Sequence, residues 1–203
     1  MTQGQLVSMA GLPAPLRWHG VPQKWALDAD NALTMTAGQR TDWFIDPADG
    51  STFANAPALL MKTHELCMLK AHVTVEYAAT YDAGVLAVYQ ADRLWGEVCL
   101  ELSPQGQLMI VSVVTKDSSD DCNSVPIAGK SVYLRLAKLE RAYAFHYSLD
   151  GHQWNMVRYF TLGGLPEVEI GFLVQSPRGD ACTAIFREIA YVPQKLSNIR
   201  SGE

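Results

Sequence analysis

The sequence predicts an all-β fold in which two antiparallel sheets pack as a sandwich. From residue 33 onward, short apolar or alternating segments recur with turn residues at about every 8 to 12 positions, which is typical of sandwiches and barrels. No segment sustains the periodicity of an amphipathic helix. The 203 residues are 48% hydrophobic and 18% charged, enough to bury a core without disulfide or metal staples. We therefore expect a single domain over residues 1–203.

The expected elements follow in order. Residues 1–30 form an irregular lead-in, and a strand-like piece lies at 32–36. A strand over 41–46 ends at the turn Asp49-Gly50, a loop covers 51–57, and a short helix is expected near Ala56 to Lys62. The strands that follow are expected at 70–81, 85–90, 95–102, 107–116, 131–139, 143–149, 153–160, 168–175 and 182–192. Residues 117–123 are predicted to be a polar loop, Ser103 to Gly106 a four-residue turn, and Asp150-Gly151 a hairpin turn.

Side chains alternate across a strand, so each strand sorts into two faces. One face is apolar in several strands, as in Val98 and Leu100. The other face carries aromatic and polar groups. If the strands are neighbours, this second face collects Trp95, Glu97, Glu101, Arg135, His146 and Gln175.

Two interpretations of that second face remain open. Aromatic groups beside hydrogen-bonding groups suit a sugar, whose C–H faces are apolar and whose hydroxyls form a rim. Trp95 would then stack on the ring while the other five residues hydrogen-bond. The alternative is a solvated sheet face on which Glu97 or Glu101 pairs with Arg135.

Charge and targeting signals narrow the partners. The net charge is −5, and the basic residues are scattered rather than clustered, so we expect neither nucleic acid nor an anionic membrane as a partner. The first 20 residues lack the apolar stretch of a secretory signal, and no apolar run is long enough to span a bilayer. A cytoplasmic location is expected.

The four cysteines, Cys67, Cys99, Cys122 and Cys182, form no CxxC pair and no zinc-binding cluster. We expect free thiols, with Cys99 and Cys182 packing as small apolar groups. Neither a cofactor nor a metal site is predicted, although Asp117, Asp120, Asp121 and Asn123 leave open a loop site for a hard cation. His146 has no partner at ligand spacing.

Several runs resemble the DUF1349 family. They are Thr41-Asp42-Trp43-Phe44, Tyr81-Asp82-Ala83-Gly84, Ser112 to Thr115 with Ser119-Asp120-Asp121-Cys122-Asn123, Ala144 to Ser148 with Asp150-Gly151 and Trp154, and Gly171-Phe172 with Gln175-Ser176-Pro177. The resemblance extends over about residues 33–192. It implies a concanavalin A-like jelly roll, similar to the C-terminal domains of some β-xylosidases. One fungal member is associated by name with the regulation of enolase. The family often has Trp-x-Lys where this chain has Trp95-Gly96-Glu97, whereas the Glu101 position matches.

Three functions follow as hypotheses. The first is a non-catalytic module that binds a carbohydrate or a similar small polar ligand. The second is a cytoplasmic regulatory protein that binds a metabolic enzyme. The third is a glycoside hydrolase, because Glu97-x-Cys99-x-Glu101 resembles the Glu-x-Asp-x-Glu strand of laminarinase-type enzymes. Its central Asp is missing, and Cα atoms four residues apart on a strand are separated by about 13 Å, more than the roughly 5 Å between carboxyl groups in retaining chemistry. No residue is predicted to be catalytic.

Overall fold

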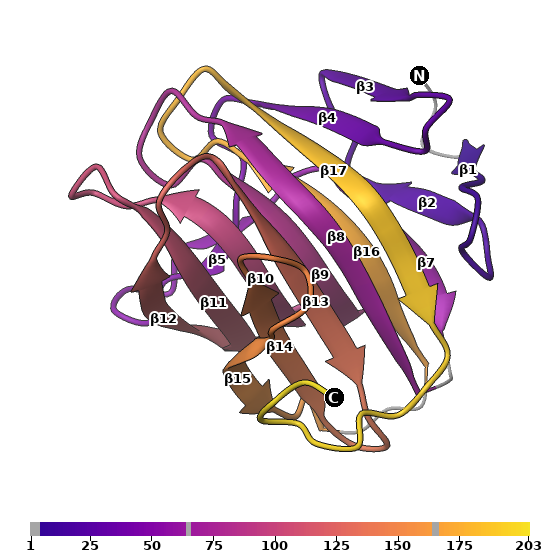
Figure 1. The fold of residues 1–203 in the computed structure, drawn as a ribbon. Helices are drawn as coiled ribbons and strands as arrows, with labels where there is room; N and C mark the ends of the chain where they lie inside the picture. The colour runs from indigo at the N-terminus through magenta and orange to yellow at the C-terminus, as the bar shows by residue number, and fades with distance from the viewer. Residues whose placement is uncertain (1–4, 64–65, 164–166) are drawn as a thin grey trace.

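The computed structural model describes residues 5–63, 66–163 and 167–203, and within them two antiparallel sheets pack face to face (Figure 1). In these residues the large sheet has eight strands, in the order β1 (Leu6–Val7), β2 (Leu16–His19), β7 (Ala58–Thr63), β16 (Val168–Gln175), β9 (Ala83–Ala91), β10 (Leu94–Leu102), β11 (Leu108–Lys116) and β12 (Ser118–Pro126). The small sheet has seven, in the order β15 (Asn155–Phe160), β14 (Tyr143–Ser148), β13 (Ser131–Lys138), β8 (Cys67–Glu76), β17 (Ala181–Val192), β4 (Leu33–Gly38) and β3 (Lys24–Leu27). The all-β sandwich prediction is therefore confirmed.

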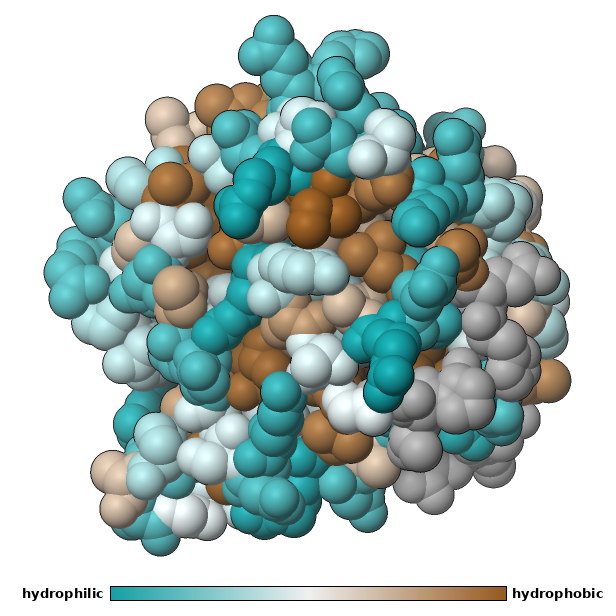
Figure 2. Space-filling model, turned by 90° about the horizontal axis from the view of Figure 1, so that it is seen from below, coloured by the Kyte–Doolittle hydropathy of each residue, from teal (hydrophilic) through white to brown (hydrophobic). Residues whose placement is uncertain are grey.

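The core between the sheets follows the predicted alternation. Val98 and Leu100 of the large sheet and Leu134 and Phe145 of the small sheet belong to one buried apolar cluster. Across the interface the rings of Phe172 and Phe186 lie 5.0 Å apart. At the end of the sandwich that faces downward in Figure 1, hydrophobic residues reach the surface between hydrophilic ones (Figure 2). No helix that could cross a membrane occurs in the described ranges.

The predicted turns and buried cysteines are confirmed. The Gly106 amide donates to the Ser103 carbonyl at 2.9 Å, which closes the turn between β10 and β11. The Asp150 carboxylate accepts from the amides of His152 and Gln153 at 2.8 Å each in the turn between β14 and β15. Cys99 and Cys182 are buried among apolar groups, and all four cysteines are free.

The structure corrects four local predictions. The lead-in contains β1, β2 and β3, which are too short to show an alternating pattern but pair with neighbours at the sheet edges. The expected helix near Ala56 to Lys62 is β7, a buried strand between β2 and β16, because a short apolar run does not distinguish a buried helix from a central strand. The loop at 51–57 contains β6 (Thr52–Ala54). The polar segment 117–123 lies largely in β12, an edge strand whose exposed side chains explain its polarity.

A separate segment covers the outer face of each sheet. The two-stranded hairpin β5 (Trp43–Ile45) and β6 lies against the large sheet, where Trp43 and Ile45 join a second apolar cluster. On the small sheet, Leu196 and Ile199 of the C-terminal segment pack on Ala137 and Ala144. The two outer faces are thus independent surfaces on opposite sides of the core.

Candidate functional site

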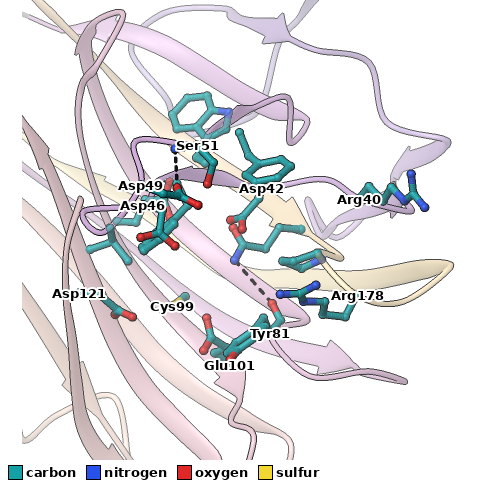
Figure 3. Close-up of a pocket in the computed structure, with 17 residues that line it drawn as sticks. Arg40, Asp42, Asp46, Asp49, Ser51, Tyr81, Cys99, Glu101, Asp121 and Arg178 are labelled. Atoms are coloured by element: carbon teal, nitrogen blue, oxygen red, sulfur yellow. Dashed lines mark hydrogen bonds between the residues drawn. The ribbon is translucent and has the colours of Figure 1, made fainter. Parts of the chain in front are cut away.

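A cavity of about 720 Å³ lies between the β5–β6 hairpin and the outer face of the large sheet. Its size is typical of small-molecule sites, which measure about 300 to 1,000 Å³. Figure 3 shows its carboxyl groups arranged around a common space. The cavity is lined by Arg40, Asp42, Trp43, Phe44, Asp46, Asp49, Ser51, Phe53, Tyr81, Glu97, Cys99, Glu101, Val113, Asp121, Gln175, Pro177 and Arg178.

The strands β10, β11 and β12 form the floor. Residues 97, 99 and 101 share one face of β10 because side chains alternate along a strand. Register places Glu97 opposite Val113, and Val113 opposite Asp121 on the edge strand. Glu97 therefore lies on an inner strand of the sheet. Asp121 is in register with it two strands away, on the exposed edge strand β12.

The β5–β6 hairpin forms one wall and is anchored on the floor. The Ile45 amide donates to the Ser119 hydroxyl at 2.9 Å, and Trp43 packs on Trp95 with ring centroids 5.6 Å apart. At the hairpin turn, Asp46 and Asp49 accept hydrogen bonds from the amides of Ala48 and Ser51. The turn is thereby held in place at the mouth of the cavity.

The opposite wall is built around the buried carboxylate of Asp82. It accepts hydrogen bonds from the amides of Ala78 and Ala79 at 2.8 and 2.9 Å and from the Ser176 hydroxyl at 2.7 Å. This network fixes the turn in which Tyr81 adopts a φ of 71°. A bulky residue with positive φ is strained, and such strain is concentrated at functional sites. Tyr81 lines the cavity in this conformation.

Two side chains that line the cavity each have a buried oxygen atom without a hydrogen-bond partner. Glu97 is 2% exposed and Gln175 is 5% exposed, yet the Oε1 atom of each has no hydrogen-bond partner. The Gln175 amide nitrogen donates to the Tyr81 carbonyl at 3.5 Å, which leaves the oxygen directed elsewhere. A buried polar atom without a partner costs about 1 to 3 kcal/mol. Both oxygen atoms are therefore available to form a hydrogen bond with a ligand or water.

Burial also alters the protonation of the carboxyl groups. Desolvation, followed by the charges of Asp42, Glu101 and Asp121, raises the pKa of Glu97 well above its usual value. Desolvation is also the largest cause that raises the pKa of Glu101 to about 8 and that of Asp42 to about 7. At neutral pH the cavity therefore offers protonated carboxyl groups, which donate as well as accept hydrogen bonds.

Three of the six residues predicted to bind a ligand come together here: Glu97, Glu101 and Gln175 all line the cavity. Trp95 lies on the same face of β10 but is packed beneath Trp43 and is 2% exposed. It borders a second cavity of about 700 Å³, beside His19 and Tyr89. The structure corrects the prediction of Trp95 as an open stacking platform, because the hairpin covers it.

Arg135 and His146 lie elsewhere, on the outer face of the small sheet. Their strands, β13 and β14, are neighbours of each other but not of β10. The Arg135 guanidinium stacks over Trp154 at 4.0 Å from the ring centre, and His146 Nε2 lies 2.7 Å from the Ile199 carbonyl. The assumption that all six residues share a face is wrong, and so is the pairing of Glu97 or Glu101 with Arg135.

Several lining residues escaped the sequence prediction, notably Asp42, Phe44, Tyr81 and Asp121. They come from loops, the short β5–β6 hairpin and an edge strand, where alternation gives no signal. The family resemblance, however, did indicate these positions. Four of its five runs supply residues to this cavity: 41–44, 81–84, 112–115 with 119–123, and 171–177. The fifth run, which ends at Trp154, lies on the small sheet.

The described residues contain no group of three or more His, Cys, Asp or Glu side chains that could hold a metal ion together. Two of the aspartates that suggested a cation loop instead pair with arginines, Asp117 with Arg93 and Asp120 with Arg158. The structure thus offers no support for a cation site in this segment.

Fold and site together define a concanavalin A-like β-sandwich module with a polar cavity on the outer face of one sheet. The sequence pattern of the family described as "Protein of unknown function (DUF1349)" matches residues 18–194. The chain therefore belongs to the DUF1349 family. No curated protein matches the chain in sequence.

Solved structures share this fold. A functionally unknown protein from Saccharomyces cerevisiae superposes with a TM-score of 0.82 at 21% identity, covering 88% of this chain and 96% of the yeast chain. A GH43 protein from Bacillus licheniformis superposes with a TM-score of 0.68 at 16% identity, and the match covers 88% of this chain but only 37% of the GH43 chain. The carbohydrate binding module CBM66 from Bacillus subtilis superposes with a TM-score of 0.57 at 14% identity, and the match covers 91% of this chain and 97% of the CBM66 chain. At these identities the likeness establishes the fold alone.

Proposed function

We propose that the protein is a non-catalytic binding module that holds a carbohydrate or a similar small polar ligand in the cavity of the large sheet. The observation that carries the proposal is the pair of buried, unpartnered oxygens of Glu97 and Gln175, which face a cavity of about 720 Å³. Ligand hydroxyls would satisfy both atoms. Native proteins leave few buried polar atoms unpaired unless a ligand, water or function uses them.

The aromatic lining supports a ring-shaped ligand. Phe44 and Tyr81 are partly exposed at the cavity, and either ring can cover the apolar C–H face of a sugar while the carboxyl groups bind its hydroxyls. One solved neighbour is named as a carbohydrate binding module, and that name also supports the proposal.

The carboxyl groups favour binding over hydrolysis. A retaining glycosidase needs one ionised carboxylate as nucleophile and one protonated acid. Burial raises the pKa of Glu97 well above its usual value and that of Glu101 to about 8. Glu101 is therefore mainly protonated at pH 7, and the pKa of Glu97 is shifted in the same direction, which disfavours an ionised nucleophile in the pair.

A thermal-shift screen against mono- and oligosaccharides tests the proposal. A ligand at ten times its Kd adds about 1.4 kcal/mol, which raises the Tm of a chain of this size by roughly 3 to 6 °C. We expect a selective rise for one sugar class over sucrose at matched concentration. Tyr81→Ala should remove it, whereas Tyr159→Ala, at an exposed tyrosine of the small sheet, should not. Equal responses of the two variants to the sugar would contradict the assignment of the cavity.

A further inference from the structure

The charged groups that line the cavity are strongly unbalanced. Six carboxyl groups line it, against two arginines; the carboxyl groups belong to Asp42, Asp46, Asp49, Glu97, Glu101 and Asp121. Arg40 extends away from these groups at the edge of the site (Figure 3). Arg178 opposes the charge of Asp42. Arg158 opposes the charge of Asp121, so the carboxyl groups still outnumber the arginines that act on them.

Glu97 is the centre of this group. Its side chain is buried in the floor, its Oε1 atom has no partner, and it interacts electrostatically with Asp42, Glu101 and Asp121. Like charges in a desolvated site repel, and this repulsion adds to burial in raising the pKa values of these four carboxyl groups. A cation inside the cavity would reverse this, because it stabilises every ionised carboxylate around it.

The cation that fits is an organic one. The described residues show no three carboxylates close enough to bind a metal ion together, so the acidic groups are distributed around the cavity rather than focused on one point. An ammonium group presents three N–H donors, which can reach separate carboxylates. The aromatic lining of Trp43, Phe44 and Tyr81 suits the ring that carries such a group.

We propose that the preferred ligand of this cavity is an amino sugar in its ammonium form, with the ammonium group donating to the carboxylate of Glu97. The inference rests on the proposed function and narrows it from sugars in general to sugars with a free amino group. N-acetylation would abolish recognition, because it removes the charge and two of the three N–H donors.

Matched titrations test the inference by isothermal calorimetry at pH 7. The probes are glucosamine, glucose and N-acetylglucosamine, and the corresponding galactose series. We expect the amino sugar of a series to bind at least tenfold more tightly than its neutral and N-acetylated partners, a difference of about 1.4 kcal/mol. Glu97→Gln should reduce that preference to less than about threefold. Glu76→Gln, the same substitution at an exposed residue of the small sheet, should leave it unchanged.

The outcomes separate this inference from the proposed function. If neutral sugars bind as tightly as amino sugars, the binding module stands and the ammonium site is wrong. If spermidine, a linear polyamine, binds more tightly than any amino sugar, the sugar part is wrong. If none of these sugars binds, the ammonium site is wrong, and a thermal-shift screen without any selective response would contradict the proposed function as well. Should Glu97→Gln not fold, judged by circular dichroism, Glu101→Gln carries the same comparison from a less buried position.

Discussion

At the scale of single residues, burial of acidic side chains at the cavity makes the stability of the protein depend on pH. Glu101 is partly exposed and still has its pKa raised from 4.5 to about 8, chiefly by desolvation. The folded protein therefore holds a proton on Glu101 that the unfolded chain releases. Because the folded state binds more protons, stability falls as pH rises through the interval between the two pKa values.

Replacing Glu101 by Gln should remove this dependence. Gln resembles the protonated acid in shape and polarity and cannot ionise. We expect the variant to match the parent protein near pH 5 and to be the more stable of the two near pH 8.5. Urea unfolding at pH 5, 6.5 and 8.5 measures the difference, and Glu76→Gln serves as the control. A difference that stays constant with pH would mean that Glu101 is not desolvated in the folded protein.

Individual residues also mark the limit of prediction from sequence. Alternation correctly placed Glu97, Glu101 and Gln175 on outer faces, because one strand determines its own faces. It could not decide whether Arg135 joins them, since that depends on which sheet contains β13. It also could not reveal that Trp95 is covered, because the β5–β6 hairpin that covers it comes from residues 43–54.

Close approach between strands limits substitution at the scale of elements. Gly171 lies in β16, between β7 and β9. A Cβ atom at this position would lie 2.1 Å from the Leu59 carbonyl oxygen and 3.0 Å from the Leu60 Cα. Both neighbours are backbone of the paired strand β7, so neither can move without disturbing the sheet.

Gly171→Ala should therefore destabilise the protein by about 1 to 3 kcal/mol, the usual range for overpacking. Gly38→Ala in β4 is the matched control, because a Cβ there would meet only the flexible side chain of Gln23. Chemical denaturation of the two variants provides the test. A loss for Gly171→Ala no larger than that for Gly38→Ala would show that β7 and β16 are not held this closely.

Elements long enough to show a period were predicted well, and short or edge elements were not. Strands β8 to β11 and β13 to β17 overlap the predicted segments, although β8 spans Cys67–Glu76 instead of the expected 70–81. The exception among strands of six or more residues away from an edge is β7 (Ala58–Thr63), whose unbroken apolar run was predicted as a helix. Strands β1 to β3 have two to four residues each and depend on pairing with distant partners. β12 is mostly polar and exposed because it is an edge strand, so its sequence resembled a loop.

At the scale of the whole molecule, the outer faces of the two sheets differ in how they are covered. On the large sheet the hairpin leaves a cavity with unpartnered polar groups. On the small sheet the C-terminal segment is packed closely onto β13 and β14: a Cβ at Gly202 would lie 2.0 Å from the Arg135 side chain. Desolvation lowers the pKa of His146 to about 4, so this covered histidine is neutral at pH 7. Arg135 and His146 are thus held between Trp154 and the C-terminal segment, although Arg135 Nε and Nη2 and His146 Nδ1 also have no hydrogen-bond partner. Neither of the two cavities on the large sheet is lined by these residues, whereas Glu97 and Gln175 line the first.

The central claim is that ligand binding occurs on the large-sheet face. Nitrogen-15 amide spectra recorded while the protein is titrated with glucosamine, and separately with glucose, test it directly. We predict that shift changes concentrate in residues 40–53, 97–101 and 175–178, with no change around Arg135, His146 and Trp154. Shift changes confined to the small-sheet face, or none with either sugar, would contradict it.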